Sequence, residues 1–207
     1  METTLRINVS ESALLILHYQ NCLLHLDGKL AAAGMPAQIQ KHKCIEHTAA
    51  SLKASRDEGM TVLYVSVGFR PGFPEIVEGA SPLLDSCKEG QAFIRGTWDA
   101  EVIDELKPLP SEIIIFNYDT SAFSHTELDI ILRAGGKKHL FLAGQTTNYI
   151  VDSTTRYGVE LGYQVTILED CCADYTDEMH DMAMTQILPR LATIAKSTDF
   201  VTALAKR

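Results

Sequence analysis

The chain has 207 residues, of which 46% are apolar and 22% charged, and its formal net charge is −9. This size and composition are typical of one globular domain with a full hydrophobic core, so we expect a single domain over residues 1–207. The negative charge argues against nucleic acid or an anionic membrane as the main partner. It does not exclude a small anionic ligand, because a local site can be basic within an acidic protein.

Residues 1–8 lack the basic end and long apolar run of a signal peptide, and no stretch approaches the length of a membrane span. The cysteines are odd in number and irregularly spaced, without a metal-ligand pattern: Cys22, Cys44, Cys87, Cys171 and Cys172. We therefore expect reduced, mostly structural thiols and a cytoplasmic location.

Strand-like and helical segments alternate along the chain, which favours a parallel α/β architecture. In chain order, the patterns predict a strand at 13–18, a helix at 36–58, a strand at 61–67, a long surface excursion at 68–96 and a strand at 113–116. A helix from 124 or 125 to 134, a strand at 139–143, a helix at 148–161, a strand at 163–168, a helix at 177–188, a short strand at 192–196 and a helix at 199–205 follow.

Three strand ends carry residues of chemical interest: His18, Asn117 and the turn at Gly144. In an open parallel sheet, binding sites form at the carboxyl ends of the strands. We therefore expect these three positions, although distant in sequence, to lie at one edge of the sheet.

The turn after the fourth predicted strand reads Gly-Gln-Thr-Thr-Asn-Tyr-Ile-Val over residues 144–151. A side chain at such a helix start lies near unpaired N–H groups and the positive end of the helix dipole, a place that lowers the pKa of a cysteine. Ile150 occupies this place and cannot act as a nucleophile. The segment resembles the nucleophile turn of the isochorismatase-like cysteine hydrolases, Gly-x-x-Thr-Asn-x-Cys-Val, and differs from it only at the cysteine.

Two further motifs carry the same resemblance. The family pattern of an apolar strand followed by Asp-x-Gln-Asn is matched by residues 18–21, with His18 at the aspartate. The pattern Ser-Ala-Phe-x-x-Thr-x-Leu is matched by residues 121–128, and the lysine that precedes it is replaced by Asn117. The resemblance therefore implies a divergent member that lacks the Asp, Lys and Cys triad.

The resemblance covers nearly the whole chain, and it implies a three-layer α/β sandwich with a central, mainly parallel six-stranded sheet. It also implies a homo-oligomer, a dimer or higher, without a cofactor. Relatives of the nicotinamidase type carry an Asp-x-His-x-x-His metal motif, and residues 66–75 contain nothing similar, so we expect no metal.

The chemical roles at these positions have alternatives. His18 is a candidate general acid or base, or it fills the vacated site and hydrogen-bonds to Asn117. Cys22 pairs with His18 as a replacement nucleophile, or it is an apolar filler.

The ligand-binding candidates also have alternative, purely structural roles. Tyr19, Tyr118 and Tyr149 line a pocket or pack as core aromatics. Arg70 clamps a carboxylate or makes a surface contact. In the turn, Gln145 and Thr146 are candidate ligand contacts, and Thr146 and Asn148 alternatively cap the helix.

Loss of a nucleophile lowers the rate of a hydrolase that depends on it by about 10⁶-fold. The leading hypothesis is therefore a pseudoenzyme that acts by protein contact or by binding a small carboxylate or amide. The alternative is an active hydrolase with rebuilt chemistry, in which His18 is the general acid or base and the substrate is a vinyl ether, amide or carbamoyl compound. A third hypothesis is a subunit that pairs with an active relative.

Overall fold

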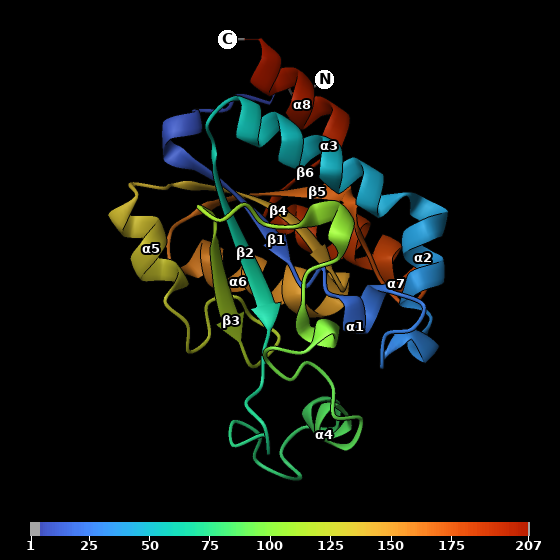
Figure 1. Ribbon diagram of the computed structural model, residues 1–207. Helices are drawn as coiled ribbons and strands as arrows, with labels where there is room; N and C mark the ends of the chain where they lie inside the picture. Colours follow the sequence, from blue (N-terminus) through green and yellow to red (C-terminus); the bar gives the residue numbers. More distant parts are fainter. Residues whose placement is uncertain (1–4, 207) are drawn as a thin grey trace.

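A single parallel sheet forms the centre of the protein (Figure 1). The computed structural model describes residues 5–206. Residues 1–4 of the N-terminal segment, which we expect not to be a signal peptide, lie outside the described residues. The six strands pair in the order β3-β2-β1-β4-β5-β6, and every pairing is parallel. Their bounds are β1 Ser12–Leu17, β2 Thr61–Val67, β3 Ile113–Asn117, β4 His139–Gln145, β5 Gln164–Ala173 and β6 Thr193–Ala195. The predicted six-stranded parallel α/β fold is confirmed.

Helices cover both faces of this sheet and make the expected three layers (Figure 1). On one face, Leu14 and Ile16 of β1 belong to a core cluster with residues of α2 Met35–His42, α3 Cys44–Asp57 and α8 Ser197–Ala205. On the other face, Leu15 and Leu17 belong to a cluster with residues of α5 Leu128–Ala134 and of segment 183–188, and α6 Asp152–Glu160 packs against it through Val159. Alternate residues of a strand point to opposite faces, so the apolar run of β1 serves both clusters.

The strand order places a topological switch point between β1 and β4, because the chain moves outward from β1 in one direction and from β4 in the other. Leu17 of β1 is directly paired with Gly144 of β4. A Cβ at Gly144 would lie 2.8 Å from Leu17 Cβ and 3.0 Å from Val151 Cγ2. Only glycine allows this close approach, which brings the carboxyl ends of the two strands together.

One predicted helix is wrong in its extent. The segment 36–58 forms two helices, α2 and α3, which meet at Lys43 with a φ of 52°. The Lys43 N–H donates to the carbonyls of Gln40 and Ile39 and ends α2. Left-handed backbone is unusual for lysine, so the sequence carries no glycine signal for this break.

Other helices are also more divided than predicted. The excursion 68–96 contains α4 Pro82–Glu89, whose Ser81 Oγ accepts from the Leu84 N–H as an N-cap. The predicted helix 148–161 begins as a π-helical turn, Thr147–Val151, before α6. The helix 177–188 divides into α7 Asp177–Met182 and a second π-helical segment, Ala183–Ile187. The remaining short elements are α1 Asn21–Leu24 and 3-10 turns at Val9–Glu11, Ala31–Ala33, Trp98–Ala100, Asp104–Leu106 and Leu188–Arg190.

Strand β5 is longer than predicted, since it continues through the polar pair Glu169 and Asp170 to Ala173. The helix expected from residue 124 or 125 begins at Leu128, because His125 has a φ of 58°. Within residues 5–206, no helix is both long and apolar enough to cross a bilayer.

The close approach of β1 and β4 is testable by Gly144→Ala. We expect this substitution to lower the free energy of unfolding by about 1–3 kcal/mol, because the new methyl group overlaps Leu17. The matched control is Gly158→Ala in α6, where a Cβ would lie no closer than 3.4 Å to its neighbours, so no loss of stability is expected. Urea unfolding of both variants measures the difference, and equal stabilities would contradict the close approach.

Candidate functional site

The carboxyl ends of β1 and β3 bring His18 and Asn117 into contact. His18 directly follows β1 and has a φ of 55°. Its backbone N–H donates to Val65 O at 2.9 Å. Its Nε2 lies 3.0 Å from Asn117 Oδ1, and both side chains are buried. The sequence-based alternative in which His18 hydrogen-bonds to Asn117 therefore describes the observed geometry.

The partners of Asn117 fix the tautomer of His18. Asn117 Nδ2 donates to Asp119 O at 2.7 Å and to Ser121 O at 3.2 Å, so Oδ1 is the atom that faces the imidazole. An amide oxygen only accepts, and Nε2 of His18 therefore carries the hydrogen. The lone pair of the neutral ring is on Nδ1, which has no hydrogen-bond partner among residues 5–206.

Burial keeps this imidazole neutral. It lowers the pKa of His18 from 6.5 to about 4, although the hydrogen bond to Asn117 acts in the opposite direction. At pH 7 only about one molecule in a thousand would carry the imidazolium form. His18 therefore presents a weak proton acceptor at neutral pH.

Ile150 lies in the π-helical turn after β4 but belongs to the apolar core. It is fully buried within the cluster that contains Leu17 and Val151. The structure thus brings together His18 and Asn117, whereas Ile150 is absent from the described residues that line the adjoining cavity.

A buried carboxylate holds this turn in place. Asp174 is 1% exposed, and its Oδ2 accepts from the backbone N–H and from Nδ2 of Asn148, both at 2.7 Å. Its Oδ1 accepts from the Tyr175 N–H at 2.8 Å. Thr146 occupies the N-cap position, yet its side chain makes no capping hydrogen bond. The anion at the start of this helical segment is therefore supplied by Asp174 at the end of β5.

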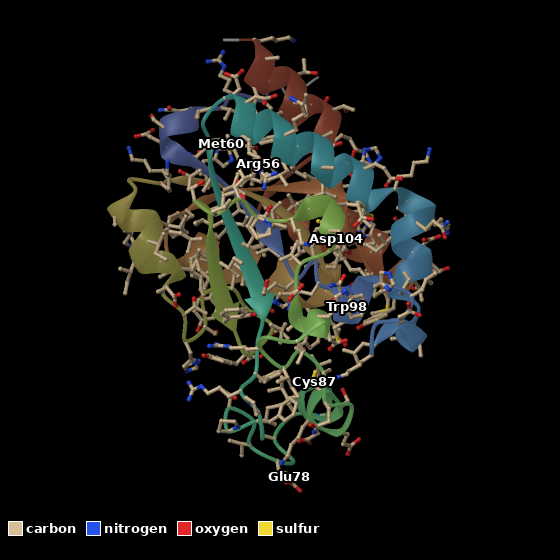
Figure 2. All side chains as sticks on the ribbon, in the orientation of Figure 1. Arg56, Met60, Glu78, Cys87, Trp98 and Asp104 are labelled. Atoms are coloured by element: carbon tan, nitrogen blue, oxygen red, sulfur yellow. The ribbon has the colours of Figure 1, made fainter. Side chains whose placement is uncertain are left out.

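A small cavity opens beside His18, with about 70 Å³ available to the centres of water-sized spheres. The strand ends contribute one wall, through His18, Val67, Tyr118, Gln145, Thr146 and Tyr175. The opposite wall comes from the excursion after β2, through Phe69, Leu83, Leu84, Cys87 and Phe93. Figure 1 shows α4 beyond the arrowheads of β2 and β3, and Cys87 is labelled on α4 in Figure 2. The sheet edge and the excursion thus enclose a largely apolar space.

The comparisons with known proteins assign the chain to a family. A family model described as the isochorismatase domain matches residues 12–199. The chain belongs to the isochorismatase family.

Several relatives are similar to this isochorismatase-family protein. Ureidoacrylate amidohydrolase RutB from Caulobacter vibrioides is 32% identical over 177 residues, which are 80% of this chain and 78% of the relative. RutB from Cronobacter sakazakii is 33% identical over 171 residues, 77% of this chain and 73% of that protein.

Solved structures show the same fold. A cysteine hydrolase from Pseudomonas syringae pv. phaseolicola has a TM-score of 0.84 at 22% identity, with 97% of this chain and 95% of that chain covered. N-carbamoylsarcosine amidase from Thermoplasma acidophilum has a TM-score of 0.72 at 25% identity, with coverages of 90% and 96%.

Four of the six predicted ligand-binding residues of the isochorismatase-family protein line the cavity: Tyr118, Gln145, Thr146 and Tyr149. The other two lie elsewhere in the described chain. Tyr19 is buried below the site, where its hydroxyl donates to Cys171 O at 2.8 Å and lies 2.6 Å from Thr48 Oγ1. Arg70 is exposed, and its Nε lies 3.1 Å from Glu75 Oε1. Arg70, the predicted carboxylate-binding residue, is therefore not part of this cavity.

Sequence reasoning missed several lining residues. Tyr175 follows β5, and it would have been found by the strand-end rule if the full length of that strand had been predicted. Leu83, Leu84 and Cys87 come from α4, for which the Ser81-Pro82 start signal was present. Asp119 and Thr120, between two recognised motifs, also line the cavity.

The five thiols are free and buried in the isochorismatase-family protein. Burial raises the pKa of Cys22, and Cys22 is not among the described lining residues, so nothing in the geometry pairs it with His18. Cys87 lines the cavity, and burial raises the pKa of its thiol to about 11. Over residues 5–206, no group of three or more His, Cys, Asp or Glu residues could hold a metal ion.

The depressed pKa of His18 predicts acid sensitivity. The unfolded chain binds a proton at this histidine below about pH 6.5, and the folded chain only below about 4, so stability falls as pH is lowered through this window. The loss contributed by His18 is about 3 kcal/mol. His18→Gln should show a smaller difference in unfolding free energy between pH 7 and pH 4, measured in urea. Burial also lowers the pKa of His139 and His180, so the variant still loses some stability between pH 7 and pH 4. Equal losses of unfolding free energy in variant and wild type would contradict the lowered pKa of His18.

The role of Asp174 in holding the turn is also testable. Asp174→Asn should lower the free energy of unfolding by about 2 kcal/mol, because charged hydrogen bonds to Asn148 are lost. The matched control is Asp181→Asn, an exposed position where we expect a change within about 0.5 kcal/mol. Thermal unfolding of the two variants checks this, and similar melting temperatures would show that Asp174 does not hold the turn.

Proposed function

We propose that this isochorismatase-family protein binds a small amide- or ureido-type molecule in the His18 cavity and lacks the cysteine-dependent hydrolysis that its sequence motifs imply. The observation that carries this proposal is Ile150, a fully buried aliphatic residue at the nucleophile position of the turn. A covalent thioester mechanism requires a thiolate at that point. The amide and ureido classes are favoured by the similarity to RutB and to N-carbamoylsarcosine amidase.

The three replacements together remove the charges that the family triad carries. A family site with aspartate, lysine and cysteine depends on charged groups that stabilise one another. Removing a single partner would leave an unpaired buried charge, which costs about 3–5 kcal/mol. His18, Asn117 and Ile150 together leave no charge at all at neutral pH, and His18 and Asn117 satisfy each other by a hydrogen bond.

No other thiol supports the nucleophilic attack that the family cysteine performs. The thiol of Cys87 lines the cavity, but with a pKa of about 11 it is protonated at neutral pH. A thiol in that form is a poor nucleophile. This supports a protein that binds its ligand without acylation.

A second candidate function rests on the free lone pair of His18. Its Nδ1 has no hydrogen-bond partner among residues 5–206 and His18 lines the cavity, so it could accept a proton from a bound water that attacks an amide. The same low pKa makes proton donation to a vinyl ether inefficient at neutral pH. The function would then be general-base hydrolysis, with a rate that falls as pH is lowered through about 4.

The experiment that separates the two functions is a turnover assay with a panel of amides, carbamoyl compounds, ureides and isochorismate. We expect no product above background from the wild-type protein, while calorimetry detects binding of phenylurea, which carries a ureido group. The mass of the intact protein after incubation should be unchanged, since no acyl-enzyme forms.

Three outcomes are decisive for this assay. Robust turnover that His18→Gln abolishes would replace the leading proposal with general-base hydrolysis. Turnover that survives His18→Gln but stops on thiol alkylation would contradict both functions. Absence of binding and turnover would remove the cavity as a ligand site.

The expected cytoplasmic location and homo-oligomeric state are proposals as well. The five free thiols support a reducing compartment. Sedimentation velocity of the purified chain tests the oligomeric state.

A further inference from the structure

One polar group in the lining of the cavity is fixed as an acceptor. Nδ1 of His18 carries a lone pair, since Nε2–H is directed at Asn117. His18 lines the cavity, and its Nδ1 has no hydrogen-bond partner among residues 5–206. This lone pair is therefore available to a ligand that donates a hydrogen bond.

No cation balances a negative ligand in this cavity. Within the described chain, the lining residues include no lysine or arginine, and the carboxylate of Asp119 is the one charged side chain. Asp119 is exposed, which places its charge at the mouth. An anion entering this space would lose water without gaining a cationic partner and would meet the like charge of Asp119.

The arginines near the site are already engaged. Arg95 Nη2 donates to the Tyr118 hydroxyl at 2.7 Å, and its Nε donates to Gly68 O at 2.8 Å. Its guanidinium lies 4.3 Å from the centroid of the Phe116 ring. Arg70 pairs with Glu75 at the surface. Neither is in the lining of the cavity as described.

The remaining wall favours an apolar body. Phe69, Phe93, Leu83 and Leu84 are apolar, and Tyr149 and Tyr175 add rings whose centroids lie 6.5 Å apart. Aromatic and aliphatic walls of this kind retain a flat apolar group by area burial and ring contacts.

We propose that the His18 cavity selects uncharged ligands that combine an N–H-donating amide or ureido group with an apolar body, and that it rejects their carboxylates. This inference rests on the proposed ligand-binding function and adds the charge class of the ligand. The N–H group donates to Nδ1 of His18, and the apolar body packs between the strand ends and α4. Ureidoacrylate, for which the RutB relatives are named, is a carboxylate, so the specificity differs from the one that name describes.

The test compares two probes that differ in one charge: phenylurea and 4-ureidobenzoate. Isothermal titration calorimetry with the full chain at low ionic strength should show binding of phenylurea and at least about tenfold weaker binding of 4-ureidobenzoate, about 1.4 kcal/mol. His18→Phe keeps a ring of similar size but removes both ring nitrogens, so it should bind phenylurea more weakly. Asp119→Asn should reduce the ratio between the two affinities by up to about fivefold. Asp181→Asn, an exposed carboxylate outside the cavity, is the control that should leave the ratio unchanged.

Each contrary result has a defined meaning. If 4-ureidobenzoate binds as tightly as phenylurea or more tightly, the charge selection is wrong, while the proposed ligand binding stands. If His18→Phe binds phenylurea as the wild type does, Nδ1 is not the acceptor and the inference fails. If neither probe binds the wild-type protein, the proposed function and this inference both fail.

Discussion

The close approach of β1 and β4 at Leu17 and Gly144 is the constraint on which the site depends. These strands lie at the point where the chain reverses its direction of progress across the sheet, and their carboxyl ends diverge into His18 on one side and the turn 146–150 on the other. A larger residue at 144 would push the strands apart. The cavity is therefore a consequence of strand order and of one missing side chain.

Electrostatic neutrality is the second organising property. A buried histidine with a lowered pKa, an asparagine and an isoleucine form a set that needs no counter-ion at neutral pH. The nearby charge of Asp174 is compensated by three N–H donors from Asn148 and Tyr175 rather than by a cation. A buried carboxylate thus lies beside the turn after β4, while His18, Asn117 and Ile150 carry no charge at neutral pH.

The excursion between β2 and β3 gives the cavity its apolar character. Its helix α4 faces the strand ends through Leu83, Leu84 and Cys87, and its Phe93 continues the same wall. This wall offers no charged side chain, and the one carboxylate in the described lining, that of Asp119, follows β3.

The sequence by itself determined the parallel α/β fold, the six strands within a few residues, and the family, because apolar runs and turn motifs are local signals. The strand-end rule also predicted that His18, Asn117 and the turn at Gly144 share one edge of the sheet, and the family resemblance singled out Ile150 within that turn. Only the tertiary structure decided that His18 and Asn117 form a hydrogen bond while Ile150 belongs to the core. It also decided that the chain breaks a helix at Lys43, and that Tyr19 and Arg70 lie away from the cavity. These outcomes depend on burial and on the partners of each polar atom, which residues distant in sequence supply, and no local pattern specifies them.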